Sequence, residues 1–202
     1  MITEIIKIEK DGKGAESALA VTEKAAAYGG LDHKEGIRLT LLSEELIGLF
    51  RSIAGDTSGS DFWIEEKDRE YKVHMKADVM MDKEMREEFL SISRSGKNAA
   101  AVGFMGKLKD LISAALLPDP EAMPIQNSVP AGFVPIGSPD SSGMAASLIW
   151  TLKEYREDQK KEVPNDTEEW DGLEKSIVAN IADDVVVSVS GSVVDVCIIK
   201  RF

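Results

Sequence analysis

The sequence RLTLLSEELIGLFRSIAG, residues 38–55, decides how the rest of the chain is expected to fold. Its apolar residues recur at three- and four-residue spacing, which places them on one face of a helix. They are Leu39, Leu42, Leu46, Leu49, Phe50 and Ile53. The pattern predicts a helix over about 33–54, ended by Gly55 and the polar run 56–60, with an apolar stripe to be buried against another element.

Segments with β-strand character lie on both sides of this helix. Residues 2–9 are rich in isoleucine, and residues 61–65 and 71–77 are joined by a charged loop. Apolar and polar residues alternate in 71–77, which is typical of a strand with one buried face. The chain closes with a predicted hairpin of strands 185–189 and 193–200 around a Ser-Gly-Ser turn.

The remaining periodic segments predict five more helices. They cover about 15–28, 83–92, 98–116, 144–158 and 170–182. The first is followed by Gly29 and Gly30, where a left-handed C-cap is favoured. Six of the seven prolines lie between residues 117 and 143. Because proline removes a backbone donor, this segment is predicted to be irregular.

Antiparallel strands followed by helices predict an α+β fold. We expect a two-layer α/β sandwich with a mixed, mostly antiparallel sheet and helices on one face. A chain of 202 residues is long enough to bury a substantial core. The expected organisation is therefore one domain over 1–202, with a helical and Pro/Gly-rich insertion over about 83–168.

Composition narrows the expected partners and location. The chain has 24 basic and 36 acidic side chains, a formal charge of −12. An acidic surface repels phosphate backbones, so nucleic acid is not expected as a partner. No apolar run approaches the ~18 residues of a membrane-spanning helix, so no membrane is expected either. With Cys197 as the single cysteine, the expected location is cytoplasmic.

Two passages resemble the GHKL superfamily, the Bergerat-fold ATP-binding domains of histidine kinases and anti-sigma factors. Residues 38–55 resemble its helix with a Glu-x-x-x-Asn motif, and residues 170–202 are similar to its closing helix and two antiparallel strands. The resemblance covers about half of the chain, in its first and last parts. It implies a degenerate bacterial member, an ATP-binding regulatory domain that signals through a protein partner and is at most a weak ATPase or kinase-like protein.

The resemblance assigns the catalytic position to Glu45. In the superfamily this glutamate activates water or orients the transfer, and the asparagine one turn later ligates a Mg²⁺ ion on the phosphates. The i, i+4 spacing places both groups on one helix face. Here the second position is Leu49, which offers no oxygen to Mg²⁺. ATP is thus the implied ligand and Mg²⁺ is in question; alternatively Leu49 is a core residue and Glu45 a solvated carboxylate.

Other residues match family positions that contact the nucleotide. Asp78, after the strand 71–77, matches an aspartate that binds the adenine amino group, but glycines that follow it in the family are replaced here, beginning with Val79. Gly96 and Lys97 precede a predicted helix and could hold phosphate at its N-terminus. Gly172 could be a remnant of a glycine motif. Each also fits a structural role as a strand end, a helix start or a loop.

Three functions are left open by these residues. One is the ATP-binding regulatory domain, and another is a nucleotide-free protein-interaction module that retains the fold. A third is the binding of another small molecule in the same pocket. An open pocket beside Glu45 and Asp78 favours a ligand-binding domain, whereas a pocket filled by the side chains of Leu49, Met80 or Met81 favours the interaction module. No metal site is expected from two separated histidines and one cysteine.

Overall fold

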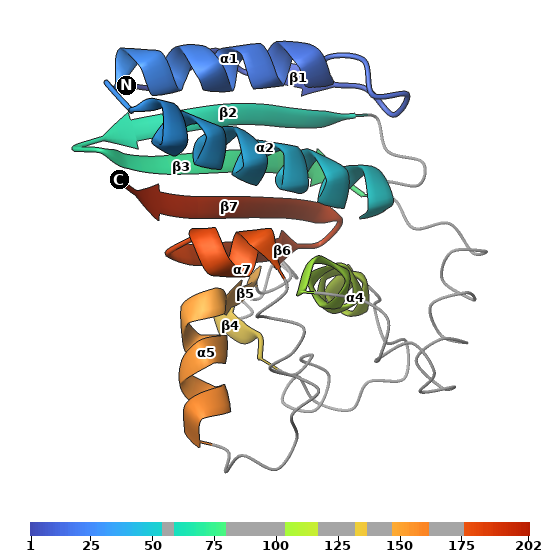
Figure 1. Cartoon of the computed structure of the whole chain (residues 1–202). Helices are drawn as coiled ribbons and strands as arrows, with labels where there is room; N and C mark the ends of the chain where they lie inside the picture. The colour runs from blue at the N-terminus through green and yellow to red at the C-terminus, as the bar shows by residue number, and fades with distance from the viewer. Residues whose placement is uncertain (54–58, 80–103, 117–131, 137–146, 162–175) are drawn as a thin grey trace, which may run out of the picture.

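The computed structural model describes residues 1–53, 59–79, 104–116, 132–136, 147–161 and 176–202. The strands are β1 (Ile6–Ile8), β2 (Ser60–Lys67), β3 (Glu70–Asp78), β4 (Val134–Ile136), β5 (Ser147–Thr151), β6 (Asp184–Ser190) and β7 (Val193–Arg201). They form one sheet in the order β1-β2-β3-β7-β6-β5-β4 (Figure 1). Every neighbouring pair in this sheet is antiparallel, so the predicted α+β fold is confirmed.

The described helices cover one face of this sheet. They are α1 (Ala15–Tyr28), α2 (His33–Ile53), α4 (Phe104–Leu116), α5 (Leu152–Lys161) and α7 (Ile177–Ile181). Figure 1 shows α1, α2 and α7 on the same side of the strands. Alternation along the strands agrees, because Phe62 and Val73 are fully buried whereas Trp63, His74 and Cys197 on the opposite face are half-buried.

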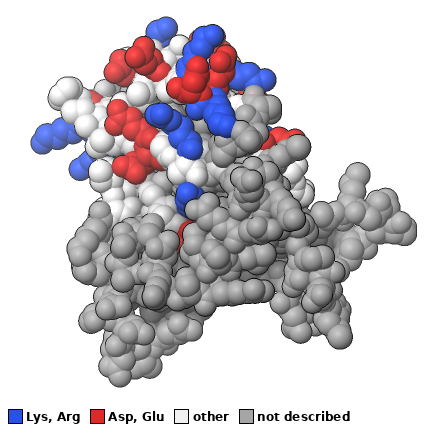
Figure 2. Space-filling view, turned by 90° about the vertical axis from the view of Figure 1, so that its right-hand side faces the viewer, with Lys and Arg blue, Asp and Glu red and all other residues white. Residues whose placement is uncertain are grey.

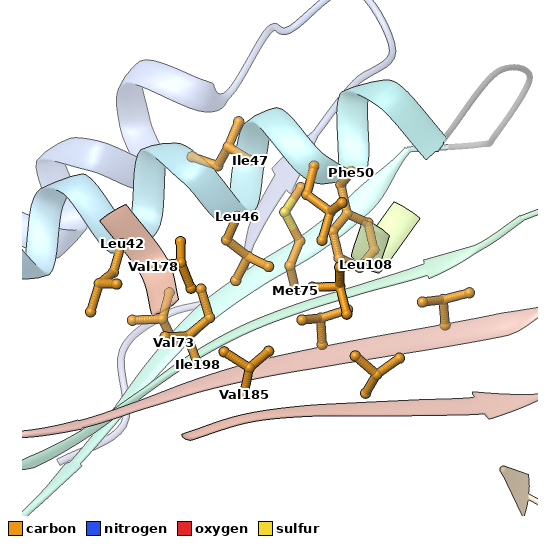
Figure 3. Packing of buried hydrophobic residues seen from close by; sticks show 14 of the residues in the cluster. Leu42, Leu46, Ile47, Phe50, Val73, Met75, Leu108, Val178, Val185 and Ile198 are labelled. Atoms are coloured by element: carbon orange, nitrogen blue, oxygen red, sulfur yellow. The ribbon is translucent and has the colours of Figure 1, made fainter. Parts of the chain in front are cut away.

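The apolar stripe of α2 forms the centre of the core. Leu42, Leu46 and Phe50 are almost completely excluded from solvent, as are Val73 and Met75 on β3 (Figure 3). Burying a side chain of this size stabilises a fold by roughly 1.5–3 kcal/mol. The stripe predicted from residues 38–55 is therefore the surface that joins the helical layer to the sheet.

Helix α2 begins with a reciprocal pair of hydrogen bonds. The Asp32 carboxylate accepts the backbone N–H of Glu35 at 2.8 Å, and the Glu35 carboxylate accepts the backbone N–H of Asp32 at 2.8 Å. This capping box satisfies two donors that the first helical turn leaves without partners. The hydrogen bond from Glu35 holds the pKa of Asp32 below its ordinary value, so the cap keeps its charge at neutral pH.

The predictions for the first two helices are confirmed. Helix α1 spans residues 15–28, and α2 begins at residue 33 and runs to Ile53. Strands β2 and β3 are longer than predicted, because the segment predicted as a loop over Glu66–Glu70 contains only a two-residue turn. Asp68 and Arg69 form it with φ angles of 52° and 63°, a left-handed geometry that suits a tight hairpin. The first strand is shorter than predicted, and Ile2 forms only an isolated bridge.

The helix predicted over 144–158 is wrong at its start. Residues 147–151 form β5, which pairs with β6, and the helix begins at Leu152. Trp150 on β5 is 2% exposed and belongs to the core. Pairing and burial in the sheet override the local apolar spacing, which reads equally well as helix or strand over so short a run.

Two further predictions are corrected by short elements. Residues 134–136, placed in an irregular segment, form the edge strand β4, where Pro135 is tolerated because an edge strand can lack a donor. The last helix does not include Ser176, which is extended and caps α7 by accepting the Ala179 N–H. The helix predicted over 83–92 and parts of three others, 98–103, 144–146 and 170–175, lie outside the described residues.

Gly29 provides a test of how α1 is seated on the sheet. A Cβ at this position would lie 1.7 Å from the Tyr71 hydroxyl oxygen, which is fully buried under α1. We predict that Gly29→Ala lowers the free energy of unfolding by about 1–3 kcal/mol through overpacking. Denaturant titration measures this. Adding Tyr71→Phe removes the clashing atom and should restore part of the loss, whereas an unchanged loss would contradict this packing.

Candidate functional site

A cavity of about 290 Å³ lies between α2 and α4. Its wall is formed by the second half of α2 and the first half of α4, two elements far apart in the sequence. The lining residues are Glu44, Glu45, Gly48, Leu49, Ser52, Met105, Gly106 and Lys109. The cavity is close to the lower limit of pockets that hold small organic ligands in proteins.

Helix α2 presents two different surfaces, one to the sheet and one to the cavity. Leu46 and Phe50 are turned to the core, while Glu44, Glu45 and Gly48 line the opening. Helical periodicity separates the two sets, since residues three or four apart share a face. Leu49 lies at the border, because it is 4% exposed and still lines the cavity. It therefore forms part of the wall without filling the space.

Two glycines widen the approach to the helix backbones. At Gly48 a Cβ would meet no atom within 4 Å, so the space beside α2 is open at this point. Gly106 lies opposite on α4. Glycine in a helix interior costs about 0.5–1 kcal/mol relative to alanine. The packing of the protein itself does not require a glycine at position 48. Another molecule can therefore approach the backbone of α2 closely at this point.

The charged groups of the cavity have both signs. Glu44 is exposed, and Glu45 and Lys109 are half-buried. The Ser52 hydroxyl donates a hydrogen bond of 2.7 Å to the Leu49 carbonyl, which ties it to its own helix. On the side of the molecule shown in Figure 2, acidic and basic side chains are interspersed over the described residues. The cavity itself offers a ligand two carboxylates, one ammonium group and the apolar surface of Leu49 and Met105.

Of the residues that the sequence predicted for the site, the structure brings one to the cavity. Glu45 lines it, together with Leu49, the residue that the resemblance matched to an asparagine. Asp78 is exposed at the end of β3 and is not among the lining residues. Gly96, Lys97 and Gly172 lie outside the described residues.

Val79 shows what replaces the first expected glycine after β3. Its backbone N–H donates to the Ser192 carbonyl at 2.8 Å, and its side chain is 2% exposed. The side chain therefore belongs to the core, and a backbone that approaches a base without a Cβ is not formed at this position.

Sequence reasoning missed the α4 side of the cavity. Gly106 and Lys109 are three residues apart on one face of α4, and Met105 is four residues before Lys109. The spacing of these residues indicates a shared helix face, because a helix that buries an apolar stripe in the core directs its other residues away from the core. The sequence could not predict that this face lies opposite α2, because periodicity identifies a helix face but not the element that the face contacts.

A second group of reactive side chains lies on the opposite face of the sheet. The Cys197 sulfur is 3.6 Å from His74 Nε2, and the His74 ring is stacked on Trp63 with centroids 4.6 Å apart. Burial, together with the charge of Asp195, raises the pKa of Cys197 to about 12. The thiol is therefore protonated at neutral pH and is not an activated nucleophile. Among the described residues, no group of three or more histidine, cysteine or acidic side chains could hold a metal ion.

The thiol gives a pH-based test of this environment. At pH 8 the thiolate fraction of Cys197 should be about a thousandfold below that of a thiol with the ordinary pKa of 9.0. We expect alkylation of the native protein by iodoacetamide to be slow, and to accelerate when denaturant exposes the residue. As the sequence holds one cysteine, mass spectrometry reports this site alone. Equal rates in the native and the denatured chain would contradict the burial of the sulfur.

Two further comparisons concern the chain as a whole: its capacity to span a membrane and its similarity to known proteins. None of the helices in the described ranges is long and apolar enough to cross a membrane. Comparison of the chain with family models, with curated proteins and with solved structures gave no match.

Proposed function

We propose that this chain is a regulatory domain that binds ATP in the α2–α4 cavity, a degenerate domain of the GHKL type. One observation carries the proposal. The helix that resembles the superfamily's glutamate-bearing helix is the helix that forms the cavity wall, and both Glu45 and Leu49 line it. The two matched positions thus lie at an open space.

The lining supplies both apolar and charged contacts for part of a nucleotide. Leu49 and Met105 offer apolar surface, which suits the faces of a purine base. Lys109 offers an ammonium group for phosphate. The absence of side chains at Gly48 and Gly106 lets a ligand reach both helix backbones. Glu45 can accept hydrogen bonds from the amino or hydroxyl groups of the ligand.

The family's Mg²⁺ ion does not fit the residues present. Its asparagine ligand is replaced by Leu49, which is apolar and 4% exposed. Mg²⁺ requires oxygen ligands in near-octahedral geometry, and a leucine provides none. We therefore assign this domain a binding and signalling role, in which nucleotide occupancy changes how α2 and α4 meet a regulatory protein partner, and we derive no phosphoryl transfer from it.

A second candidate function is a protein-interaction module without a nucleotide. The charge of the cavity favours it, because the two carboxylates Glu44 and Glu45 outnumber the one ammonium group of Lys109 and so repel a polyphosphate. The burial of Val79 where the family carries a glycine favours it as well. Direct binding measurements separate the two functions.

The melting temperature of the purified protein, with and without ATP and with and without Mg²⁺, tests the proposal. At about 100 times its dissociation constant, a ligand stabilises the native state by about 2.7 kcal/mol. For a chain of this size the melting temperature should then rise by roughly 5–10 °C. Absence of a shift under every condition would contradict ATP binding and leave the interaction module.

Two variants locate the bound nucleotide. Gly48→Leu places an apolar side chain in the open space beside α2, where its Cβ meets no atom within 4 Å, so it should abolish the shift. Lys109→Gln should weaken ATP binding by about tenfold or more through loss of a charged hydrogen bond. Lys107→Gln is the matched control, because it removes the same charge from the same helix and Lys107 does not line the cavity. A shift that survives in Gly48→Leu would place the nucleotide elsewhere.

A further inference from the structure

The sheet face opposite the helices carries its charges in a regular order. Lys7, Asp61, Lys76 and Asp195 are in register across β1, β2, β3 and β7. Paired residues of an antiparallel sheet point to the same side, so these four side chains form one row with alternating positive and negative charge. Neither Lys76 nor Asp61 forms an ion pair with another residue in the part of the chain that is described.

A second row lies four residues further along β2, β3 and β7. It consists of Ile2, Glu65, Lys72 and Ile199, again in register. Its order is apolar, negative, positive, apolar. Between the two rows the stacked rings of Trp63 and His74 occupy the middle of the face.

Each row is complementary in charge to a second copy of itself that runs in the opposite direction across the sheet. A twofold axis parallel to the strands, placed between β2 and β3, sets β1 of one copy against β7 of another and β2 against β3. Lys7 then meets Asp195, Asp61 meets Lys76 and Glu65 meets Lys72, in both directions. Ile2 meets Ile199, and Trp63 meets His74. Moving the axis between β3 and β7 sets Glu65 against Asp184 and loses this match.

We propose that a second copy of this chain packs on this face about a twofold axis along the β2–β3 boundary, forming a sheet-on-sheet dimer. Closed twofold contacts are the commonest assembly of soluble proteins, and they require a self-complementary surface. The chain carries a charge of −12, which opposes the association of most surfaces. In the two rows of this face three lysines stand beside three carboxylates, so the contact itself adds no net repulsion.

The side chains of the face are accessible enough to form such a contact. Ile2 is 70% exposed, and the side chains of Lys72, Glu65 and Asp195 are 40%, 42% and 34% exposed. Trp63 is half-buried at the centre, a residue type that dominates the energy of many interfaces. Four strands about 4.8 Å apart span roughly 19 Å. An interface of this width is small, which favours a weak, reversible dimer over a permanent one.

Sedimentation equilibrium of the full chain, from about 1 μM to about 1 mM in low salt, tests the proposal. We expect a reversible monomer–dimer equilibrium. Lys76→Glu sets two carboxylates against each other in the first row and should weaken the dimer at least tenfold. Lys24→Glu, on the exposed surface of α1, changes the net charge equally and should leave the equilibrium near that of the wild type.

The double variant Asp61→Lys/Lys76→Glu keeps the result interpretable. It reverses the order of the central charges while preserving their complementarity, so it should restore the dimer that Lys76→Glu weakens. Circular dichroism melting verifies that each variant is folded. A monomer at every concentration would overturn the proposal. So would a dimer that Lys76→Glu leaves unchanged, because the copies would then meet through another surface.

Discussion

Helix α2 packs its apolar stripe on β3, and the other elements take their places around this contact. Leu42, Leu46 and Phe50 lie with Val73 and Met75 in one buried cluster, which the close view shows between helix and sheet (Figure 3). Deleting a large buried side chain typically costs 2–5 kcal/mol, a large part of the 5–15 kcal/mol that holds a domain folded. The rotation of α2 about its axis is thereby fixed, and with it the direction of every residue outside the stripe.

This fixed rotation places the cavity. Because the stripe faces the sheet, Glu45 and Gly48 must face away from it, toward α4. The same layer arrangement leaves the opposite face of the sheet to a different set of side chains, with Trp63 and His74 at its centre. The molecule thus has two separate surfaces available for recognition: a small cavity between helices and a flat sheet face with alternating charges.

The sequence was sufficient for the elements whose signals are local. Periodicity and caps located α1 and α2, and alternation located β3 and the closing hairpin. It failed for residues 147–151, whose strand state depends on pairing with β6, and for 134–136, where Pro135 suggested a loop. Glu45 was assigned from a resemblance, but Lys109 was not, because its role depends on which helix lies across the cavity. Residue patterns specify faces, whereas sites require knowing which faces meet.

We propose that a nucleotide occupies the space between α2 and α4. Amide chemical shifts of ¹⁵N-labelled protein, followed by NMR during titration with ATP, detect such binding residue by residue. The largest changes should centre on Gly48 and Gly106, which face the cavity from the two helices. Changes confined to the open sheet face, or no changes at millimolar ATP, would contradict it.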